Sequence, residues 1–414
     1  MFFKALLLYI LVDTSRIQEY FKILGTLKIQ KMLALLALFG FLFSPGLFRN
    51  LKKNLATSQA KILMFLVFWM ILSVPFSVWP GASFIYLTES LWKSLLMCFL
   101  MLSYGFSQER LKQIILTYFF GTIIFGALGI WLKDINALGI DTSYDRNEFA
   151  MQFVIALPLA FWHARSSEGI SRVCSFLLCL ITPILIIASQ SRGAFLGIVA
   201  VLIVLLEQSR RLSVKSLLLG LFIVTFFFCL IYFVGGSMYL ERLQTLINPS
   251  EDYNITSEVG RLAVWKRGLA LMSSNPLLGV GINGFVFAEG LATQTTGFNI
   301  KWSAAHNSFL QIGVELGIPG LIAYLAIIYI ILRNARLQIL AERVNVISTQ
   351  YNSNMKRAII VSWIGFFVSG FFLSMAMSQV FWFLFAISTI LLKLNLIQQG
   401  PEDKGKNESL RDFH

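Results

Sequence analysis

Residues 308–332 read SFLQIGVELGIPGLIAYLAIIYIIL, a long apolar run with one charged side chain, Glu315, and an interruption by Gly-Ile-Pro-Gly at 317–320. A helix of about 20 such residues spans the roughly 30 Å hydrocarbon core of a bilayer. The whole chain has the same character, because 57% of its residues are hydrophobic and 13% are charged, and its mean hydropathy is +0.73. Soluble domains carry about 25% charged residues. The sequence therefore predicts a polytopic membrane protein.

The apolar runs do not alternate with polar residues, and this excludes a porin-type barrel. Since backbone groups in lipid must be hydrogen-bonded within the protein, we predict an all-α helical bundle. Eleven segments are expected to cross the membrane, at 31–49, 60–80, 84–104, 110–132, 148–163, 172–189, 193–207, 215–235, 308–332, 358–378 and 380–397. The opening residues, 1–12, form a twelfth, short candidate. No small-residue cleavage site follows them, which favours a span over a signal peptide.

Lysine and arginine in the short loops predict the orientation of the bundle, because positive residues near helix ends tend to stay cytoplasmic. One set of loops is rich in them: Arg49, Lys52, Lys53, Lys61, Arg110, Lys112, Arg165, Arg172, Arg210, Arg211, Lys215, Arg333, Arg336, Arg343, Lys356 and Arg357. The opposite short loops hold Lys133, Arg146 and Arg192. The stretch from Asp13 to Gln30 is an exception, with Arg16, Lys22 and Lys28 on the predicted outer side. Much of the net charge of +13 is thus explained by topology, and nucleic-acid binding is not needed.

This orientation divides the chain into four parts. Residues 1–235 are N-terminal transmembrane helices, 236–306 a large periplasmic loop with amphipathic helices, 307–397 C-terminal transmembrane helices, and 398–414 a cytoplasmic polar tail. Function is expected in the large loop. There, Leu262, Trp265, Leu269 and Met272 have helical spacing, and a helix at the membrane surface fits them. Its Arg261, Lys266 and Arg267 could contact lipid phosphates.

The stretch GVGING, Gly279 to Gly284, matches the pattern G-x-G-x-x-G. No strand precedes it and no βαβ unit surrounds it, so the context of a dinucleotide site is missing. We expect a tight glycine loop instead. Cys98, Cys174, Cys179 and Cys229 all lie in apolar segments without C-x-x-C spacing, so no metal site is predicted.

Two single residues and one charged pair are considered next for chemistry. His306 directly precedes the apolar run at 308–332, where it could act in catalysis or cap the helix beside Asn307. Arg192 lies at a minimal outward turn, where snorkelling to the interface is the alternative, and Gly193 would let another group approach the backbone closely. Glu89 and Lys93 are spaced i, i+4 within a span, which favours a self-neutralising pair.

Four motifs in order resemble the O-antigen ligase/polymerase family: DRNEFAMQFVIALPLAF (145–161), SQSRGAFLGIVAVLIVLL (189–206), GRLAVWKRGLALMSSNPLLGVGINGF (260–285) and AHNSFLQIGVELGIPGLIAYL (305–325). The similarity runs from about Asp145 to Leu332. The resemblance implies a GT-C-like helical bundle of about a dozen spans that moves a lipid-linked glycan to an acceptor on the periplasmic face. Typical members read Asp-Pro-Asn where this chain has Asp145-Arg146-Asn147.

The resemblance agrees with the chemistry of the candidate residues. A glycan that leaves undecaprenyl diphosphate expels a diphosphate, whose developing charge needs fixed cations. Arginine grips phosphate oxygens bidentately, so Arg192 and Arg261 are expected to bind the diphosphate without a metal or other cofactor. His306, with a reference pKa of about 6.5, can accept the proton of the acceptor hydroxyl or donate to the diphosphate. Secondary candidates are Arg267, Lys93, Arg146 and Asn307.

The predicted activity is an inverting O-antigen ligase of the inner membrane of a Gram-negative bacterium, with lipid A-core as acceptor and membrane lipids as further partners. A repeat-unit polymerase is the first alternative. It often has two sizeable outward loops and an R-x10-G spacing, whereas one large loop is expected here and Met272 follows Arg261 at the eleventh position. Protein O-glycosylation uses the same chemistry. A transporter or flippase would commonly show two related halves, and no such repeat is seen.

Overall fold

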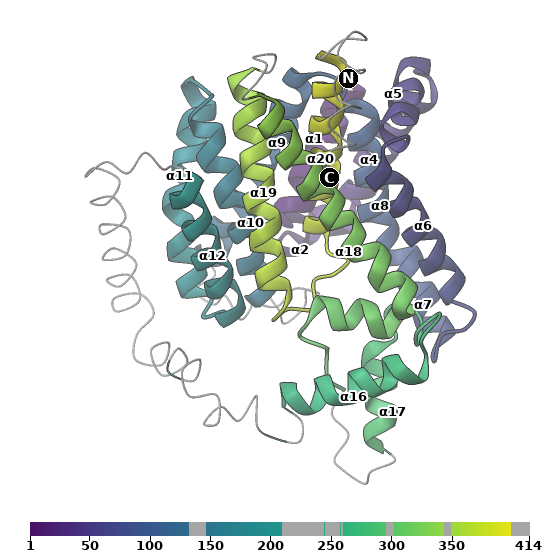
Figure 1. Ribbon diagram of the computed structural model, residues 1–414. Helices are drawn as coiled ribbons and strands as arrows, with labels where there is room; N and C mark the ends of the chain where they lie inside the picture. Colours follow the sequence, from purple (N-terminus) through teal and green to yellow (C-terminus); the bar gives the residue numbers. More distant parts are fainter. Residues whose placement is uncertain are drawn as a thin grey trace.

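The computed structural model describes residues 1–131, 146–208, 260–294, 302–342 and 349–398, together with Gln244 and Ser257. The segment predicted at 215–235, most of the polar tail and parts of the 236–306 loop lie outside these residues. Every regular element in the described ranges is a helix, which confirms the all-α prediction. Figure 1 shows most of the helices side by side, with α16 and α17 at one end of the bundle.

The helices follow the predicted apolar segments closely. Their bounds are α1 Phe2–Ser15, α2 Ile17–Tyr20, α3 Lys22–Thr26, α4 Ile29–Leu42, α5 Pro45–Leu55, α6 Ser58–Ser73, α7 Pro80–Ile85, η1 Tyr86–Leu91, α8 Trp92–Tyr104, α9 Gln108–Trp131, α10 Arg146–Ala164, α11 Gly169–Ala188, α12 Arg192–Gln208, α16 Arg261–Ser274, α17 Phe285–Gln294, α18 Ser308–Glu342, α19 Gln350–Gly370 and α20 Gln379–Gln398.

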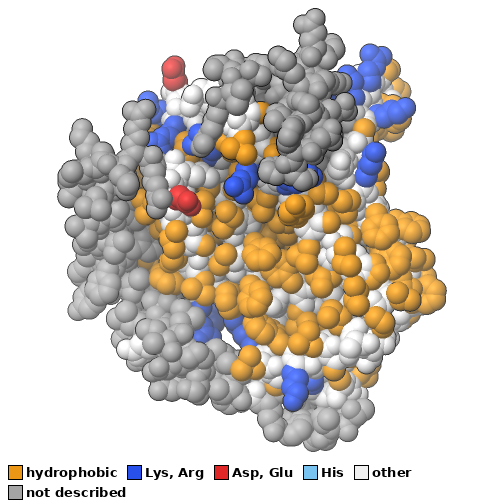
Figure 2. Space-filling view, in the orientation of Figure 1, with side chains coloured by type: hydrophobic (Ala, Val, Ile, Leu, Met, Phe, Trp, Pro, Cys, Tyr) orange, Lys and Arg blue, Asp and Glu red, His pale blue; other side chains and the backbone are white. Residues whose placement is uncertain are grey.

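The protein has helices suited to a membrane. Four helical stretches of the described chain are long and apolar enough to cross a bilayer: 80–104, 108–131, 169–188 and 308–342. The pair α4 and α5 adds a fifth if it counts as one span. Figure 2, in the same orientation as Figure 1, shows a broad band of hydrophobic side chains across the visible face, with Lys and Arg mainly above it. This arrangement is typical of a protein embedded in lipid.

Two predicted segments and one predicted ion pair differ from the structure. The run at 31–49 is not one straight helix, because α4 and α5 meet at an angle of 97° where Pro45 begins α5. The run at 358–378 is helical only to Gly370, and residues 371–378 form an irregular connection between α19 and α20. The predicted ion pair between Glu89 and Lys93 is wrong, because the salt bridges of the described residues do not include it. Residues 86–91 form a π-helical turn, which stacks residues five apart rather than four.

Helix α10 is the centre of the bundle. Every residue from Phe149 to Ala160 is buried, so the helix is apolar on all sides, as expected for a helix surrounded by protein. It packs against α9, α11, α12 and α19. This close packing fixes the position of α10 in the bundle.

Helix α18 is kinked at the Gly-Ile-Pro-Gly interruption, where Gly317 has a φ of 69°. The kink frees backbone groups that the GVGING loop binds, since the Val280 and Gly281 amides donate to the Val314 and Glu315 carbonyls at 2.8 and 3.0 Å. Trp69 Nε1 donates to the Leu316 carbonyl at 2.9 Å. Irregular backbone at membrane depth is tolerated only where other groups satisfy it in this way. The prediction of a tight glycine loop is confirmed, and its role is to complete the broken helix.

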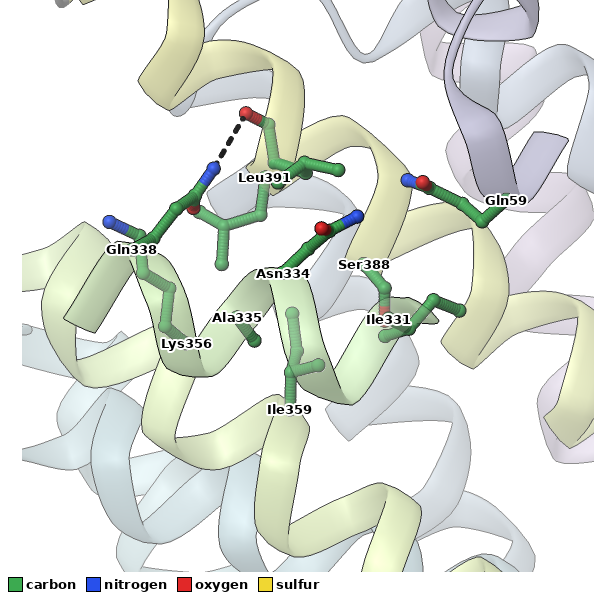
Figure 3. A pocket seen from close by; sticks show the side chains of 10 residues that line it. Gln59, Ile331, Asn334, Ala335, Gln338, Lys356, Ile359, Ser388 and Leu391 are labelled. Carbon is green, nitrogen blue, oxygen red and sulfur yellow. Dashed lines mark hydrogen bonds between the residues drawn. The ribbon is translucent and has the colours of Figure 1, made fainter. Parts of the chain in front are cut away.

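A small polar cavity lies near the opposite end of α18 from His306 (Figure 3). It is lined by Gln59, Ile331, Asn334, Ala335, Gln338, Lys356, Ile359, Ser388, Leu391 and Leu392. Figure 3 shows the amides of Gln59 and Asn334 directed toward one another across it. The buried Lys356 ammonium is paired with Glu342. The cavity belongs to the packing of α6, α18, α19 and α20 and is separate from the candidate site.

Candidate functional site

The site is built on the connection between α19 and α20, residues 371–378, which we call the support segment. Helix α18 begins against it. The fully buried Ser308 hydroxyl donates to the Leu373 carbonyl at 2.6 Å and accepts from the Met375 amide at 2.9 Å. Tyr324, further along α18, donates to the Ala376 carbonyl at 3.1 Å. These bonds fix the N-terminus of α18 relative to the support segment.

His306 lies two residues before α18 in a left-handed backbone conformation, with a φ of 46°. Its amide donates to Ser374 Oγ of the support segment at 2.8 Å. A left-handed non-glycine residue is uncommon and is often found at functional sites, where the surrounding structure holds it. The histidine is half-buried. Its backbone is therefore anchored, and its ring lies at the start of a helix.

Asn307 is the residue that caps α18. Its Oδ1 atom accepts hydrogen bonds from the amides of Phe309 and Leu310, both at 3.0 Å. This is the usual geometry of an N-cap asparagine. The alternative interpretation of His306 as the cap is thus wrong, because its neighbour has that role. The capping function also explains Asn307 without any contact to substrate.

Arg192 is the first residue of α12. The residues on either side of it, Ser191 and Gly193, connect the start of α12 to the start of α10 and to the support segment. Ser191 Oγ donates to Asn147 Oδ1 at 2.7 Å, which places the start of α12 beside the start of α10 and its first residue, Arg146. A Cβ atom on Gly193 would lie 2.9 Å from Phe372 Cβ. The prediction that Gly193 permits a close approach is confirmed, and the approaching group is the support segment.

Arg261 is the first residue of α16, which lies across the same region. One turn later, Trp265 Nε1 donates to the Ala305 carbonyl at 2.8 Å. The Trp265 ring also meets the Phe371 ring edge to face, with centroids 5.6 Å apart. The apolar residues of this helix were predicted to share one face. In the structure Leu262 and Leu269 are exposed, whereas Trp265 contacts the protein. The helix is confirmed, and its first turns rest on the residues before His306 and on the support segment.

Four helices thus begin around one short segment: α10 at Arg146, α12 at Arg192, α16 at Arg261 and α18 just after His306. Each N-terminus carries a partial positive charge from its free backbone amides. Three of them also carry an arginine in the first position. Figure 2 shows Lys or Arg side chains at a hollow in the lower part of the visible face, the end at which α16 and α18 begin in Figure 1. The arrangement suits an anionic ligand.

The secondary candidates Arg267 and Lys93 lie in other surroundings. Arg267 Nη2 and Nε donate to Glu289 Oε1 at 2.6 and 3.0 Å, and Glu289 is fully buried. The other oxygen of Glu289 accepts from the Ser303 amide at 3.3 Å. This ion pair connects α16 to α17, and the Glu289–Ser303 bond connects α17 to the irregular segment that leads to His306. Lys93, in α8, accepts a hydrogen bond from Tyr9 at its carbonyl and lies within electrostatic range of Asp13.

Several residues of the site were not predicted. Ser308, Ser374 and Glu289 support His306 and α16, but a serine within an apolar run gives no signal of its function in sequence. Glu289 could have been noticed as an acidic residue in the outer loop that lies 22 positions from Arg267. The described residues contain no group of three or more His, Cys, Asp or Glu that could hold a metal ion.

Comparison with known proteins shows a similarity to one family over part of the chain. Residues 176–325 match the family model of the O-antigen ligase domain. The resemblance that the four motifs indicated is confirmed. The matched region, 176–325, includes Arg192, Arg261 and His306 and ends within α18, beyond the kink.

Two curated relatives carry a related name. A candidate polysaccharide ligase of Rickettsia conorii is 25% identical over 298 residues, which cover 67% of this chain and 66% of the relative. A candidate polysaccharide ligase of Rickettsia felis is 26% identical over 244 residues, 56% of this chain and 54% of the relative. This chain therefore spans somewhat less than two thirds of the length of one relative and about half of the other.

Proposed function

We propose that this protein is a metal-independent, membrane-embedded glycosyltransferase that transfers O-antigen polysaccharide from undecaprenyl diphosphate to lipid A-core. A polysaccharide ligase is supported by the O-antigen ligase domain, and a membrane location by the apolar helices. The proposal places about twelve spans in the inner membrane of a Gram-negative bacterium, with the site facing the periplasm. The division at residues 235, 306 and 397 belongs to the same proposal.

The observation that carries the proposal is the position of four helix N-termini around the support segment, next to His306. Charge develops on the diphosphate as the glycosidic bond breaks. Fixed amide dipoles and arginines stabilise such charge without reorganising during the reaction. In our proposal Arg192 and Arg261 bind the diphosphate, and Arg146 assists from the start of α10. Arg267 is left out because Glu289 occupies its guanidinium.

His306 is proposed to act as the general base. It takes the proton of an acceptor hydroxyl, and the hydroxyl oxygen forms a bond to the anomeric carbon of the donor sugar. The bond from this carbon to the diphosphate oxygen breaks, and the electron pair leaves with the undecaprenyl diphosphate. Direct displacement inverts the anomeric centre. The proton stays on His306 as an imidazolium, and Arg192 and Arg261 stabilise the negative charge of the departing undecaprenyl diphosphate.

Two alternatives share this chemistry and one does not. A repeat-unit polymerase or a protein O-oligosaccharyltransferase would use the same base and cations with another acceptor. A transporter would need a broken helix that exposes backbone groups to its cargo. The backbone groups at the kink of α18 are instead bound by the GVGING loop and Trp69, which favours an enzyme.

The glycan pattern of cells tests the proposal. In cells that carry His306→Ala or His306→Gln in place of the native protein, we expect long polymerised glycan to accumulate on its lipid carrier while lipid A-core stays bare. Glutamine keeps a hydrogen bond but cannot take the proton, so both variants should lose activity about a hundredfold or more. Lipid A-core that carries a single repeat unit would move the assignment to polymerase. Normal long-chain product would remove His306 from the mechanism.

A further inference from the structure

A buried polar cluster joins the end of the first helix to the start of the last one. Asp13 and Arg16 are 2% and 6% exposed, and they lie at the C-terminal end of α1. Gln379, the first residue of α20, donates through Nε2 to Asp13 Oδ1 at 2.6 Å. Arg16 Nη2 donates to Gln379 Oε1 at 3.4 Å. Both ends of the Gln379 carboxamide are therefore held by charged partners.

The charges of this cluster are costly in their surroundings. Burying a charged group inside a protein is costly unless the group is paired and hydrogen-bonded. The cluster has partners of its own, since Gln30 also donates to Asp13 and Arg16 forms an ion pair with Glu19 at 2.9 Å. An apolar contact could join α1 to α20 at lower cost. Hydrogen bonds to charged groups, however, are directional and about twice as strong as neutral ones, so they hold a side chain in one position.

Gln379 directly follows the support segment, which is bonded along its length to the site. The Ser378 amide donates to the Met375 carbonyl at 3.2 Å. The Met375 amide donates to Ser308, and Ser374 accepts the amide of His306. Hydrogen bonds and the backbone links between neighbouring residues thus connect Asp13 and Arg16, through Gln379 and the support segment, to the backbone of His306.

We propose that Asp13 and Arg16 are positioning residues for His306. They fix Gln379, and Gln379 sets the place of the support segment that holds the left-handed His306 backbone. A displacement of about 1 Å far from the reacting atoms can lower a rate about a hundredfold. Both residues lie outside the O-antigen ligase domain at 176–325. The inference rests on the proposed role of His306.

The test compares two variants on the purified full-length protein. Gln379→Leu removes both bonds to the cluster. Tyr9→Phe is the matched control, because it removes another buried bond of α1, from the Tyr9 hydroxyl to the Lys93 carbonyl, that does not lead to the support segment. For transfer from a lipid-linked glycan, we expect Gln379→Leu to lower kcat 10- to 100-fold with KM for the donor within about twofold. Tyr9→Phe should keep kcat within about twofold.

A second pair of variants examines the hydrogen bond itself. Asp13→Leu should lose activity as Gln379→Leu does, whereas Asp13→Asn keeps an acceptor oxygen for Gln379 and should restore most of kcat. A role confined to stability would lower the amount of folded protein in all variants and leave kcat per folded molecule unchanged. That result would overturn the inference.

Hydrogen–deuterium exchange gives a readout that does not depend on any reaction. The amides of His306 and Met375 are protected by bonds to Ser374 and Ser308, so peptides that cover 303–308 and 371–378 should exchange several-fold faster in Gln379→Leu than in Tyr9→Phe. Equal exchange in both variants would contradict the inference even if transfer is confirmed. Faster exchange, together with full activity of His306→Ala, would support the path but refute the proposed role of His306.

Discussion

Arg192 and Arg261 each occupy the first position of a helix, so their side chains and the free amides of the first turn act in the same place. A lysine there would keep the charge but lose the planar fork that binds two phosphate oxygens at once. Their proposed role therefore needs both the positive charge and the planar guanidinium group. Geometry and charge can be separated by substitution.

We predict that Arg192→Lys and Arg261→Lys each lose activity that corresponds to about 2–4 kcal/mol of transition-state stabilisation. The measurement is kcat/KM for glycan transfer by purified protein. Lys266→Gln is a suitable control, because Lys266 is an exposed residue of the same helix as Arg261 and should be near neutral. Near-native rates in both lysine variants would reduce these arginines to surface or packing charges.

At the residue scale, the candidate site was predictable where the chemistry needs a rare residue type in an outer loop. His306, Arg192 and Arg261 stood out for that reason. The structure places the backbone of His306 and the start of α12 against the support segment, and Arg261 one turn before Trp265, whose ring contacts Phe371. Its supporting groups were not predictable, since Ser308, Ser374 and Glu289 act through contacts between distant segments. The Glu89–Lys93 prediction failed because a π-helical turn, which sequence spacing does not reveal, changes the register.

Helix α18 and the GVGING loop form one structural unit at the element scale. The kink exists because Pro319 has no amide hydrogen and Gly317 adopts a left-handed conformation. The loop fits only because Gly279 and Gly281 have φ angles of 65° and 91° and leave room for neighbouring backbone. Two glycine-rich motifs 35 residues or so apart therefore depend on each other.

Gly281→Ala tests this unit. An added Cβ would overlap with Ser77, and the left-handed backbone adds about 1–2 kcal/mol, so we expect a loss of stability of about 2–5 kcal/mol in all. Gly169→Ala is the matched control, because Gly169 also has a positive φ, 57°, but has open space around its Cα. Its cost should be about 1–2 kcal/mol. Equal melting temperatures for the two variants in detergent would show that the loop does not pack as described.

The limits of sequence prediction for helices are clearest in the run at 358–378. Hydropathy marks it as one span, but the helix ends at Gly370 and the remaining residues become the support segment. Hydropathy reports that a segment is buried in apolar surroundings and not whether it is helical. Leu373, Met375, Ala376 and Met377 are buried by neighbouring parts of the protein, so tertiary packing decides the conformation of residues 371–378.

The orientation of the whole molecule is a prediction from charge. A reporter that is active only after export should be active when fused after Glu251, whereas one fused after Asn345 should behave as cytoplasmic. Both positions lie outside the described residues, and the test depends only on the chain order of the spans. Finding both fusions on the same side of the membrane would contradict the outward placement of the site.

The central claim is that this molecule transfers a finished glycan from a polyprenyl diphosphate to a lipid A-core acceptor. The most direct measurement mixes purified protein in detergent, without a gradient and with a metal chelator, with undecaprenyl diphosphate-linked glycan and lipid A-core. We predict glycosylated lipid A-core with an inverted anomeric linkage, and at least a hundredfold less with His306→Ala. Longer glycan that remains on the lipid carrier, or transfer that stops when the metal is chelated, would contradict the account.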